Sequence, residues 1–337
     1  MQDGGAAMSG EALPDMPPLT YVETNGIRMA CYDVAGEGVP VVFCHGFPEL
    51  AYSWRHQLAA FAQAGHRALA PDQRGYGLTD RPEAVESYDM EQLCADLAGL
   101  LDAKGIERAI FCGHDWGGFV VWQMALRHPA RVAGVIGLNT PFIPRLSADP
   151  IALMRAGLGE DMYIVWFQKP GEADAVLAKD VDKTFRFFMR RPTMSPAEFA
   201  ALPPEQKNFA LGSMLGAYDP AGDAHQLLSD AERAAFVDTF ARTGFTGGIN
   251  WYRNFTRNWQ RSAGIVDRVD CPALMITAEC DHVLPPAMAE GMEKYVPDLD
   301  RHMVAGSGHW TQQEKPEEVS RVILEWIARR FPNEGEQ

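Results

Sequence analysis

The chain has 337 residues, and its 45 aspartates and glutamates outnumber its 30 lysines and arginines, which gives a formal net charge of −15 at pH 7. A chain this acidic, without a long basic run, is a poor candidate for binding nucleic acid or an anionic membrane surface. Hydrophobic residues make up 47% of the chain and charged residues 22%, a balance typical of a globular protein with about two structural units.

Residues 1–18, MQDGGAAMSGEALPDMPP, are small, polar and rich in proline, and we expect them to form a mobile tail. They lack the basic and apolar regions of a signal peptide. No run of 18 apolar residues occurs, so the sequence predicts no membrane-spanning segment. The six cysteines show neither a CxxC pair nor zinc spacing, which favours reduced thiols in a cytoplasmic protein without a metal site.

From residue 19 onward, segments typical of strands alternate with segments typical of helices. Short apolar runs predict buried strands at 39–46, 66–72, 108–113, 132–141, 271–280 and, running into a loop, 301–309. Amphipathic or capped segments predict helices at 53–65, 89–105, 114–129, 287–296 and 316–331. Ser53 and Asp89 are the expected N-caps of the first two helices, and Gly65 and Gly105 are their expected ends.

Residues 144–261 differ from the rest, because the strand pattern disappears and aromatic residues, methionine and helix formers dominate. Strands separated by helices predict a mostly parallel sheet with helices on both faces. We therefore expect an α/β core made of residues 19–143 and 262–337, interrupted by a mostly helical insertion over 144–261.

The stretch Gly113-His114-Asp115-Trp116-Gly117 lies where a predicted strand ends and a helix begins, which is the pattern of a nucleophile elbow. The glycines permit a sharp turn that raises the middle side chain over the carboxyl edge of the sheet, where open α/β sheets bind ligands. The N-terminus of the following helix favours a negative charge there. We predict that Asp115 is a nucleophile, although an acidic residue in a tight turn or at a helix N-cap would give the same short pattern.

An aspartate at the elbow determines the class of reaction. A carboxylate that attacks a saturated carbon forms an alkyl ester, which water can cleave at the carboxyl carbon, whereas a serine would form a stable ether. Asp115 therefore predicts substrates with an electrophilic saturated carbon, such as epoxides or alkyl halides.

A nucleophile of this kind needs a base and a group that orients the base. His309 lies in the glycine-rich loop AGSGHW after the last predicted strand, and Asp281 follows the preceding strand in TAECDHVL. The order Asp115, Asp281, His309 matches the nucleophile–acid–base order of this kind of fold. His309 could instead be a surface histidine and Asp281 a turn former, with Glu279 and His282 as weaker candidates for the acid.

The backbone N–H groups of Phe47 and Trp116 are expected to form an oxyanion hole. Phe47 belongs to the loop HGFP, which follows the first predicted buried strand, and Trp116 follows the nucleophile. Such a hole would stabilise the tetrahedral intermediate when water attacks the Asp115 ester. His45, in the same loop, is expected to order the loop and not to transfer protons.

Several longer motifs occur in the chain: HGFPE, YSWRHQ, DQRGYG, GHDWGG, WFQKPGEAD, INWYRN, TAECDHVL and GHWTQQEKP. Together they resemble an epoxide hydrolase of the α/β-hydrolase superfamily, and most of all the hydrolase domain of the soluble epoxide hydrolases. The resemblance covers about residues 19–332. It implies an α/β-hydrolase fold, with a mostly parallel sheet flanked by helices and an inserted helical cap, and it implies no metal or organic cofactor.

The resemblance also implies that two cap tyrosines donate hydrogen bonds to the epoxide oxygen. The matching positions are Tyr163 in MYIVWFQKPG and Tyr252 in INWYRN, with Tyr218 as a fallback. The implied substrates are a lipophilic epoxide and water, converted to a vicinal diol by a monomer or a homodimer. An apolar pocket would be lined by aromatic residues, any of which could instead be ordinary core: Phe47, Trp116, Trp166, Trp251 and Trp310.

The nearest alternative is a haloalkane or haloacid dehalogenase, which also uses an aspartate nucleophile. Many haloalkane enzymes have an asparagine where this chain has Phe47, and haloacetate-type enzymes have an arginine where it has Trp116, so both positions disfavour a halide site. A non-catalytic small-molecule receptor is an alternative of another class, because a fold does not determine a function. An esterase would need a serine at the elbow.

Overall fold

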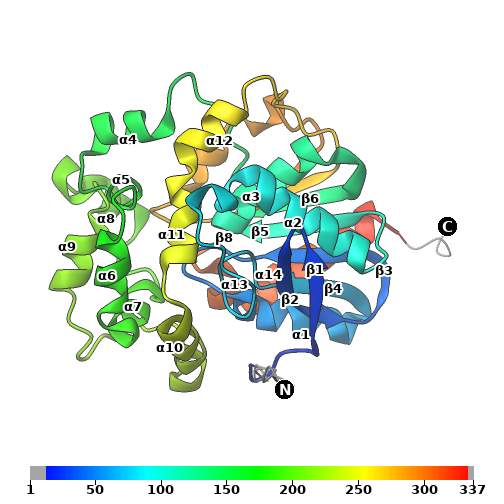
Figure 1. Cartoon of the computed structure of the whole chain (residues 1–337), viewed down its shortest axis with the longest axis horizontal. Helices are drawn as coiled ribbons and strands as arrows, with labels where there is room; N and C mark the ends of the chain where they lie inside the picture. The colour runs from blue at the N-terminus through cyan, green and yellow to red at the C-terminus, as the bar shows by residue number, and fades with distance from the viewer. Residues whose placement is uncertain (1–12, 333–337) are drawn as a thin grey trace, which may run out of the picture.

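The computed structural model describes residues 13–332, which form an eight-stranded sheet with the order β1-β2-β4-β3-β5-β6-β7-β8 (Figure 1). β1 and β2 pair antiparallel, β2 also pairs antiparallel with β4, and the other neighbours are parallel. The predicted mostly parallel sheet is therefore confirmed. Its strands are β1 Leu19–Thr24, β2 Ile27–Val34, β3 Glu37–Cys44, β4 His66–Pro71, β5 Ala109–His114, β6 Val132–Leu138, β7 Ala273–Ala278 and β8 Leu299–Val304.

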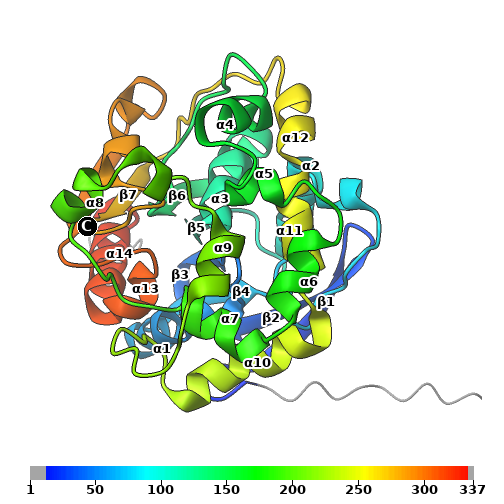
Figure 2. The ribbon, with the colours of Figure 1, turned by 90° about the vertical axis from the view of Figure 1, so that its left-hand side faces the viewer.

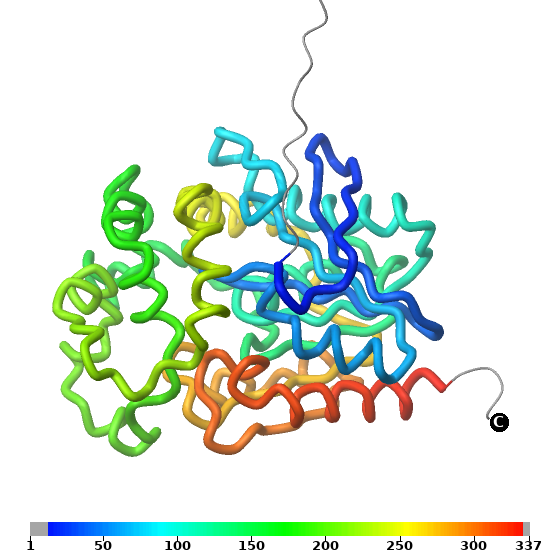
Figure 3. The backbone as a smooth tube through the Cα atoms, turned by 90° about the horizontal axis from the view of Figure 1, so that it is seen from below, coloured from blue at the N-terminus to red at the C-terminus, as the bar shows by residue number. Residues whose placement is uncertain are grey.

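Helices cover both faces of this sheet. On one face lie α1 Arg55–Ala64 and α14 Pro316–Arg330, whose apolar side chains share one core cluster with β3 and β5. Figure 3 shows α14, in red, running alongside α1. On the other face lie α2 Met90–Ala103 and α3 Trp116–Arg127, within a second cluster that continues into the inserted helices. Because both faces are covered, β5 and β6 are buried along their whole length.

The helices between β6 and β7 form the cap. Figure 1 shows most of them gathered at one end of the molecule, and Figure 2 looks onto that end. The loops that follow β3, β5, β6, β7 and β8 meet the cap there, and side chains from both parts line the cavities between them. The cap helices are α4 Pro150–Leu158, α5 Tyr163–Trp166, α6 Glu172–Ala178, α7 Val181–Phe188, α8 Pro196–Ala201, α9 Leu211–Ala217, α10 Asp230–Thr243, α11 Thr246–Arg253 and α12 Phe255–Arg261. A short helix, α13 Thr311–Glu314, precedes α14.

Local sequence signals account for several element ends. Asp89 caps α2 by accepting a hydrogen bond from the Gln92 N–H, and the left-handed Gly65 ends α1, as predicted. The prediction that Ser53 is an N-cap is wrong. Ala51–Trp54 form a 3-10 turn, and α1 follows this turn without a side-chain cap.

The predicted helix at 287–296 is also wrong. The segment holds two 3-10 turns, Pro286–Ala289 and Met292–Lys294, separated by the extended Glu290 and the left-handed Gly291. Glycine adopts a positive φ without the steric penalty of other residues, so the chain changes direction here and does not continue a helix.

The N-terminal segment differs in part from the expected tail. Residues 1–12 lie outside the described part of the chain. Leu13 and Met16 pack against the core, and the Pro18 carbonyl accepts the Asp33 N–H over 3.3 Å, so residues 13–18 lie against the body of the protein. Strands β1 and β2, which continue from this segment, were not among the predicted elements. No helix within residues 13–332 has the length and apolar character needed to cross a bilayer.

Candidate active site

Asp115 lies at the sharp turn between β5 and α3. Its backbone has φ 50° and ψ −120°, outside the regions that residues with a side chain favour. The turn depends on glycine neighbours, because a Cβ at Gly113 would collide with the Gly117 carbonyl and a Cβ at Gly117 would collide with the Cys44 carbonyl. Backbone strain of this kind is concentrated at functional sites, where the surrounding structure maintains it.

Two backbone N–H groups contact the Asp115 carboxylate. The Phe47 N–H donates to Oδ1 over 2.7 Å, and the backbone N–H of Trp116 is close enough to help lower the pKa of the same carboxylate. Burial raises the pKa of Asp115, whereas the charges of His309 and His114 and the two N–H donors oppose this rise. The structure thus brings the two expected oxyanion-hole donors together on one carboxyl group.

His309 lies between Asp115 and Asp281. Its Nδ1 lies 2.9 Å from Asp281 Oδ2, and its Nε2 lies 3.9 Å from Asp115 Oδ2. Burial by itself lowers the pKa of His309, but the Asp281 carboxylate, helped by Asp115 and Glu49, outweighs burial and raises the pKa to about 9. Because Nδ1 is bonded to Asp281, Nε2 is the nitrogen that is available on the side of Asp115.

Asp281 is almost completely buried and accepts several hydrogen bonds. Its Oδ1 accepts the N–H groups of Val283 and Leu284 at 2.9 and 3.0 Å, and its Oδ2 accepts a 2.7 Å bond from the Asn139 side chain. Burial raises the pKa of Asp281, but His309 and these hydrogen bonds hold it well below its usual range. Asn139 was not predicted from the sequence, although a polar residue directly after a buried strand, in GLNTP, is a signal for this sheet edge.

A buried pair, Glu49 and His114, lies beside these residues. Glu49 Oε2 lies 2.8 Å from His114 Nδ1 and accepts the Gly46 N–H over 3.0 Å, while His114 Nε2 lies 2.6 Å from the His309 carbonyl oxygen. Burial raises the pKa of Glu49, but His114 outweighs this effect and the pKa is lowered to about 2. The pair therefore joins the Phe47 loop to the His309 loop. Neither residue was predicted from the sequence, although they stand in the motifs HGFPE and GHDWGG.

Tyr163 and Tyr252 line the same cavities as Asp115, from the cap side. Tyr163 begins α5, Tyr252 lies in α11, and their ring centroids are 5.8 Å apart. Burial raises the pKa of both phenols and the negative charge of Asp115 raises it further, so both hydroxyls keep their protons at neutral pH. The fallback donor, Tyr218, instead donates a 2.8 Å bond to Asp223 elsewhere in the cap.

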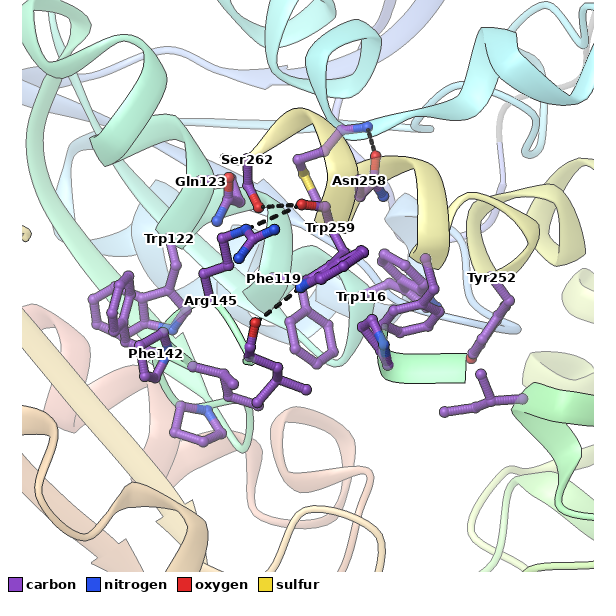
Figure 4. A pocket seen from close by; sticks show the side chains of 18 of the residues that line it. Trp116, Phe119, Trp122, Gln123, Phe142, Arg145, Tyr252, Asn258, Trp259 and Ser262 are labelled. Atoms are coloured by element: carbon purple, nitrogen blue, oxygen red, sulfur yellow. Dashed lines mark hydrogen bonds between the residues drawn. The ribbon is translucent and has the colours of Figure 1, made fainter. Parts of the chain in front are cut away.

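Two cavities meet at Asp115, with volumes of about 360 Å³ and about 310 Å³. Residues that line both are Asp115, Tyr163, Phe209, Tyr252 and Val283. Figure 4 shows the first cavity, whose walls include Trp116, Phe119, Trp122, Phe142 and Trp259. Walls of the second include Phe47, Phe188, Phe199, Trp310 and the arginines Arg190 and Arg191. Aromatic walls with few polar groups suit a lipophilic ligand. No group of three or more His, Cys, Asp or Glu side chains among residues 13–332 is arranged to hold a metal ion.

Three of the five expected pocket residues line these cavities, namely Phe47, Trp116 and Trp310. Trp166 and Trp251 line neither cavity, contrary to the prediction. Trp251 is fully buried behind Trp116, with ring centroids 5.7 Å apart, and its indole donates to the Arg74 carbonyl over 3.0 Å. Trp166 packs within the cap against Phe167. Neighbouring residues on a helix point to different sides, and a motif does not say which side faces the cavity.

Comparisons with known proteins identify the family. The sequence profile of the family described as alpha/beta hydrolase fold matches residues 39–316. The chain is 43% identical over 318 residues to epoxide hydrolase A of Mycobacterium tuberculosis, a match that covers 92% of this chain and 97% of that protein. It is 41% identical over 310 residues to bifunctional epoxide hydrolase 2 of Mus musculus, covering 91% of this chain but only 55% of that protein.

A solved structure gives the same result. The crystal structure of epoxide hydrolase A from Mycobacterium thermoresistibile matches with a TM-score of 0.82 at 42% sequence identity, over 92% of this chain and 98% of that chain. A TM-score of 0.82 over almost the whole of both chains shows that they share one fold. The chain therefore belongs to the α/β-hydrolase family, among the epoxide hydrolases.

Proposed function

We propose that this protein hydrolyses lipophilic epoxides to vicinal diols through an alkyl ester on Asp115. The observation that carries the proposal is the placement of the two Asp115 oxygens. Oδ1 accepts the N–H of Phe47, whereas Oδ2 faces His309 across 3.9 Å, at the junction of two apolar cavities lined by Tyr163 and Tyr252. One oxygen is thus held by the backbone and the other is free to attack.

In the first step, Asp115 Oδ2 attacks one carbon of the epoxide ring. The bond between that carbon and the ring oxygen breaks, and its electron pair goes to the oxygen. Tyr163 and Tyr252 donate hydrogen bonds to this oxygen, and one phenol transfers its proton as the alkoxide develops. The imidazolium of His309 restores the phenol proton by way of water.

In the second step, water hydrolyses the ester. His309, oriented by Asp281, takes a proton from water, whose oxygen attacks the carboxyl carbon of Asp115. The negative charge that develops on Oδ1 is stabilised by the N–H groups of Phe47 and Trp116, of which the Phe47 N–H already donates to Oδ1 in the resting protein. The bond from the carboxyl carbon to the product oxygen then breaks, and that oxygen takes the proton from His309. The oxygen of water remains in Asp115, and the proton that it still carries moves to His309, which restores the carboxylate and the imidazolium.

Formation of the ester also prepares the base. The charge of Asp115 is one of the causes that raise the pKa of His309 to about 9. An ester is neutral, so alkylation of Asp115 lowers this pKa and favours the unprotonated imidazole that step two needs. The base therefore becomes active after the substrate has been bound covalently.

We further propose that residues 144–261 act as the cap over a catalytic core of residues 19–143 and 262–337. Tyr163 and Tyr252 both lie in that segment, while Asp115, Asp281 and His309 all follow core strands. Closing the cap over the strand ends removes the reacting atoms from bulk water, which strengthens the hydrogen bonds to the developing charges.

The test is a single turnover of styrene oxide in heavy-oxygen water with enzyme in excess. Mass spectrometry of the peptides should place the label in Asp115 and none in the first diol released. Asp96, which is buried in an ion pair with Arg74, serves as the unlabelled internal control. Label that enters the diol directly would contradict the ester mechanism, and halide release from haloalkanes without diol from any epoxide would favour a dehalogenase.

A further inference from the structure

The carboxylate of Glu314 lies against the loop that carries His309. The Gly308 N–H donates to Oε2 over 2.9 Å, and the Trp310 N–H donates to Oε1 over 3.0 Å. One side chain, only 7% exposed, therefore binds the residues on both sides of His309. We propose that Glu314 is a positioning residue that fixes the general base for ester hydrolysis, a role that rests on the function proposed above.

The loop needs such an anchor because of its composition. Gly306, with φ 63°, and Gly308 lie just before His309, and glycine has more conformational freedom to lose than any other residue. A catalytic group must be held within about 0.5 Å of its productive position. Glu314 holds the N–H groups of this loop, while His114 Nε2 lies 2.6 Å from the His309 carbonyl oxygen. The backbone on both sides of the imidazole is thereby fixed.

The chemistry of the site calls for a carboxylate. An ionised carboxylate only accepts hydrogen bonds, and its two oxygens match the two N–H groups of Gly308 and Trp310. A glutamine has nearly the same shape, but it offers one oxygen and one NH₂ group. In Glu314→Gln one loop N–H would therefore lose its acceptor and face a donor in a buried position, which is unfavourable. Burial raises the pKa of Glu314, and the same two N–H groups together with the charge of His309 oppose this rise.

The two-step mechanism separates a positioning role from a general effect on stability. Alkylation of Asp115 does not need the base, whereas ester hydrolysis does. In Glu314→Gln we expect an unchanged alkylation rate and a hydrolysis rate that is about 10- to 100-fold lower, because small displacements of catalytic groups reduce rates by such factors. Rapid quenching with intact-mass spectrometry measures both rates and should show the alkyl-enzyme accumulating.

The matched control is Glu317→Gln, because Glu317 is an exposed residue in the first turn of α14. This variant should match the wild type in both steps. A Glu314→Gln protein that slows both steps equally, or neither, overturns the proposal. If Glu314→Gln does not fold, Glu314→Asp keeps both acceptors on a shorter side chain and should slow hydrolysis selectively, and equal slowing of both steps or of neither again overturns the proposal.

A second measurement does not depend on turnover. The proton on His309 Nδ1, held between the imidazole and Asp281, should give a low-field resonance in proton NMR spectra of the wild type and of Glu317→Gln. In Glu314→Gln this resonance should broaden or disappear, and an unchanged resonance would overturn the positioning role. If the wild type formed no alkyl-enzyme, the proposed function would fail, and the resonance would still decide the role of Glu314.

Discussion

The Nε2 atom of His309 lies 3.9 Å from Oδ2 of Asp115, which is too far for a hydrogen bond and close enough for a strong electrostatic interaction. The opposite nitrogen of the ring is fixed by Asp281 at 2.9 Å, so the imidazole cannot swing toward Asp115 without losing that bond. The gap leaves Oδ2 open to a substrate carbon and Nε2 open to a water molecule. Oδ2 can therefore attack the substrate first, and Nε2 can then activate a water molecule in the same space.

Replacing His309 with glutamine should stop the second step and spare the first. General-base catalysis contributes about 10²- to 10⁴-fold, so the alkyl-enzyme should persist longer by a factor in that range. Intact-mass spectrometry after one exposure to styrene oxide should find the protein plus one substrate mass. His302→Gln is the control, because His302 lies within β8 and pairs with Glu318 of α14. The absence of any adduct in His309→Gln would contradict these roles.

Removing the cap phenols should slow the first step. In Tyr163→Phe and Tyr252→Phe, alkylation should be about 10- to 100-fold slower, because the remaining phenol still donates to the epoxide oxygen, and the double variant should lose far more. Rapid-quench measurement of the alkylation rate checks this. Tyr218→Phe, whose hydroxyl bonds to Asp223, should behave like the wild type. A loss confined to ester hydrolysis would argue against the proposed donors.

The pH dependence of ester hydrolysis should report the state of His309. The base must be unprotonated, so the rate should rise as the pH passes the pKa of His309 and then level off. That pKa is raised to about 9 in the resting protein, and the inflection should lie below this value because the ester removes the charge of Asp115. Asp281→Asn removes the largest cause that raises the pKa and should move the inflection to lower pH.

The decay of the alkyl-enzyme, followed from about pH 6 to about pH 10, measures this inflection. A rate that falls across the whole range would mean that His309 acts in its protonated form in this step. If the inflection lay at the same pH in Asp281→Asn, Asp281 would not be the group that raises the pKa of His309.

The candidate site at the carboxyl edge of the sheet was predictable because its side chains directly follow strands. Asp115, Asp281 and His309 lie in the loops after β5, β7 and β8, and parallel strands bring their carboxyl ends to one edge. The same rule could have identified Asn139 after β6. Strands β1 and β2 were not predicted because polar and charged residues interrupt their apolar ones, whereas β3 holds the first strong apolar run.

Contacts between distant parts of the chain could not be predicted from the sequence. Glu49 and His114 are 65 positions apart, and only the fold shows that they meet. The rotation of a cap helix was equally hidden, since Trp251 and Tyr252 are adjacent and only Tyr252 lines a cavity. The extended Glu290 and the left-handed Gly291 divide the expected helix into two turns.

Trp166 and Trp251, which were predicted in the pocket but line neither cavity, should affect stability and not substrate selectivity. Trp251→Phe loses a buried hydrogen bond to the Arg74 carbonyl and should lower the free energy of unfolding by about 1–3 kcal/mol, whereas the half-buried Trp166 should cost less when changed to phenylalanine. Both variants should keep the wild-type ratio of kcat/KM between styrene oxide and the larger stilbene oxide. Phe119 lies in the wall of the first cavity, so Phe119→Ala should change this ratio. Denaturant unfolding measures the free energy of unfolding, and steady-state kinetics measures the kcat/KM ratio. If Trp251→Phe shifted the ratio as much as Phe119→Ala, Trp251 would contribute to the pocket after all.

Asn139 offers the sharpest test of how Asp281 is held. Its backbone has φ 63°, so Asn139→Gly removes the side chain without adding strain. The variant loses the 2.7 Å bond to Asp281, and a hydrogen bond to a charged group contributes about 1.5–3 kcal/mol. We therefore expect ester hydrolysis to slow at least about tenfold, because 1.4 kcal/mol corresponds to a factor of ten, while alkylation of Asp115 is unchanged.

The matched control is Asn25→Gly, because Asn25 also has a positive φ, 44°, and lies in the turn between β1 and β2, with side-chain bonds to Gln92 and Asp96. Rapid-quench kinetics on both variants separates alkylation from hydrolysis. If the two variants hydrolysed the ester at the same rate, the Asn139 side chain would have no part in orienting Asp281. If Asn139→Gly slowed alkylation as well, its effect would extend to the elbow, because the Thr140 hydroxyl that follows it donates to the Asp115 carbonyl.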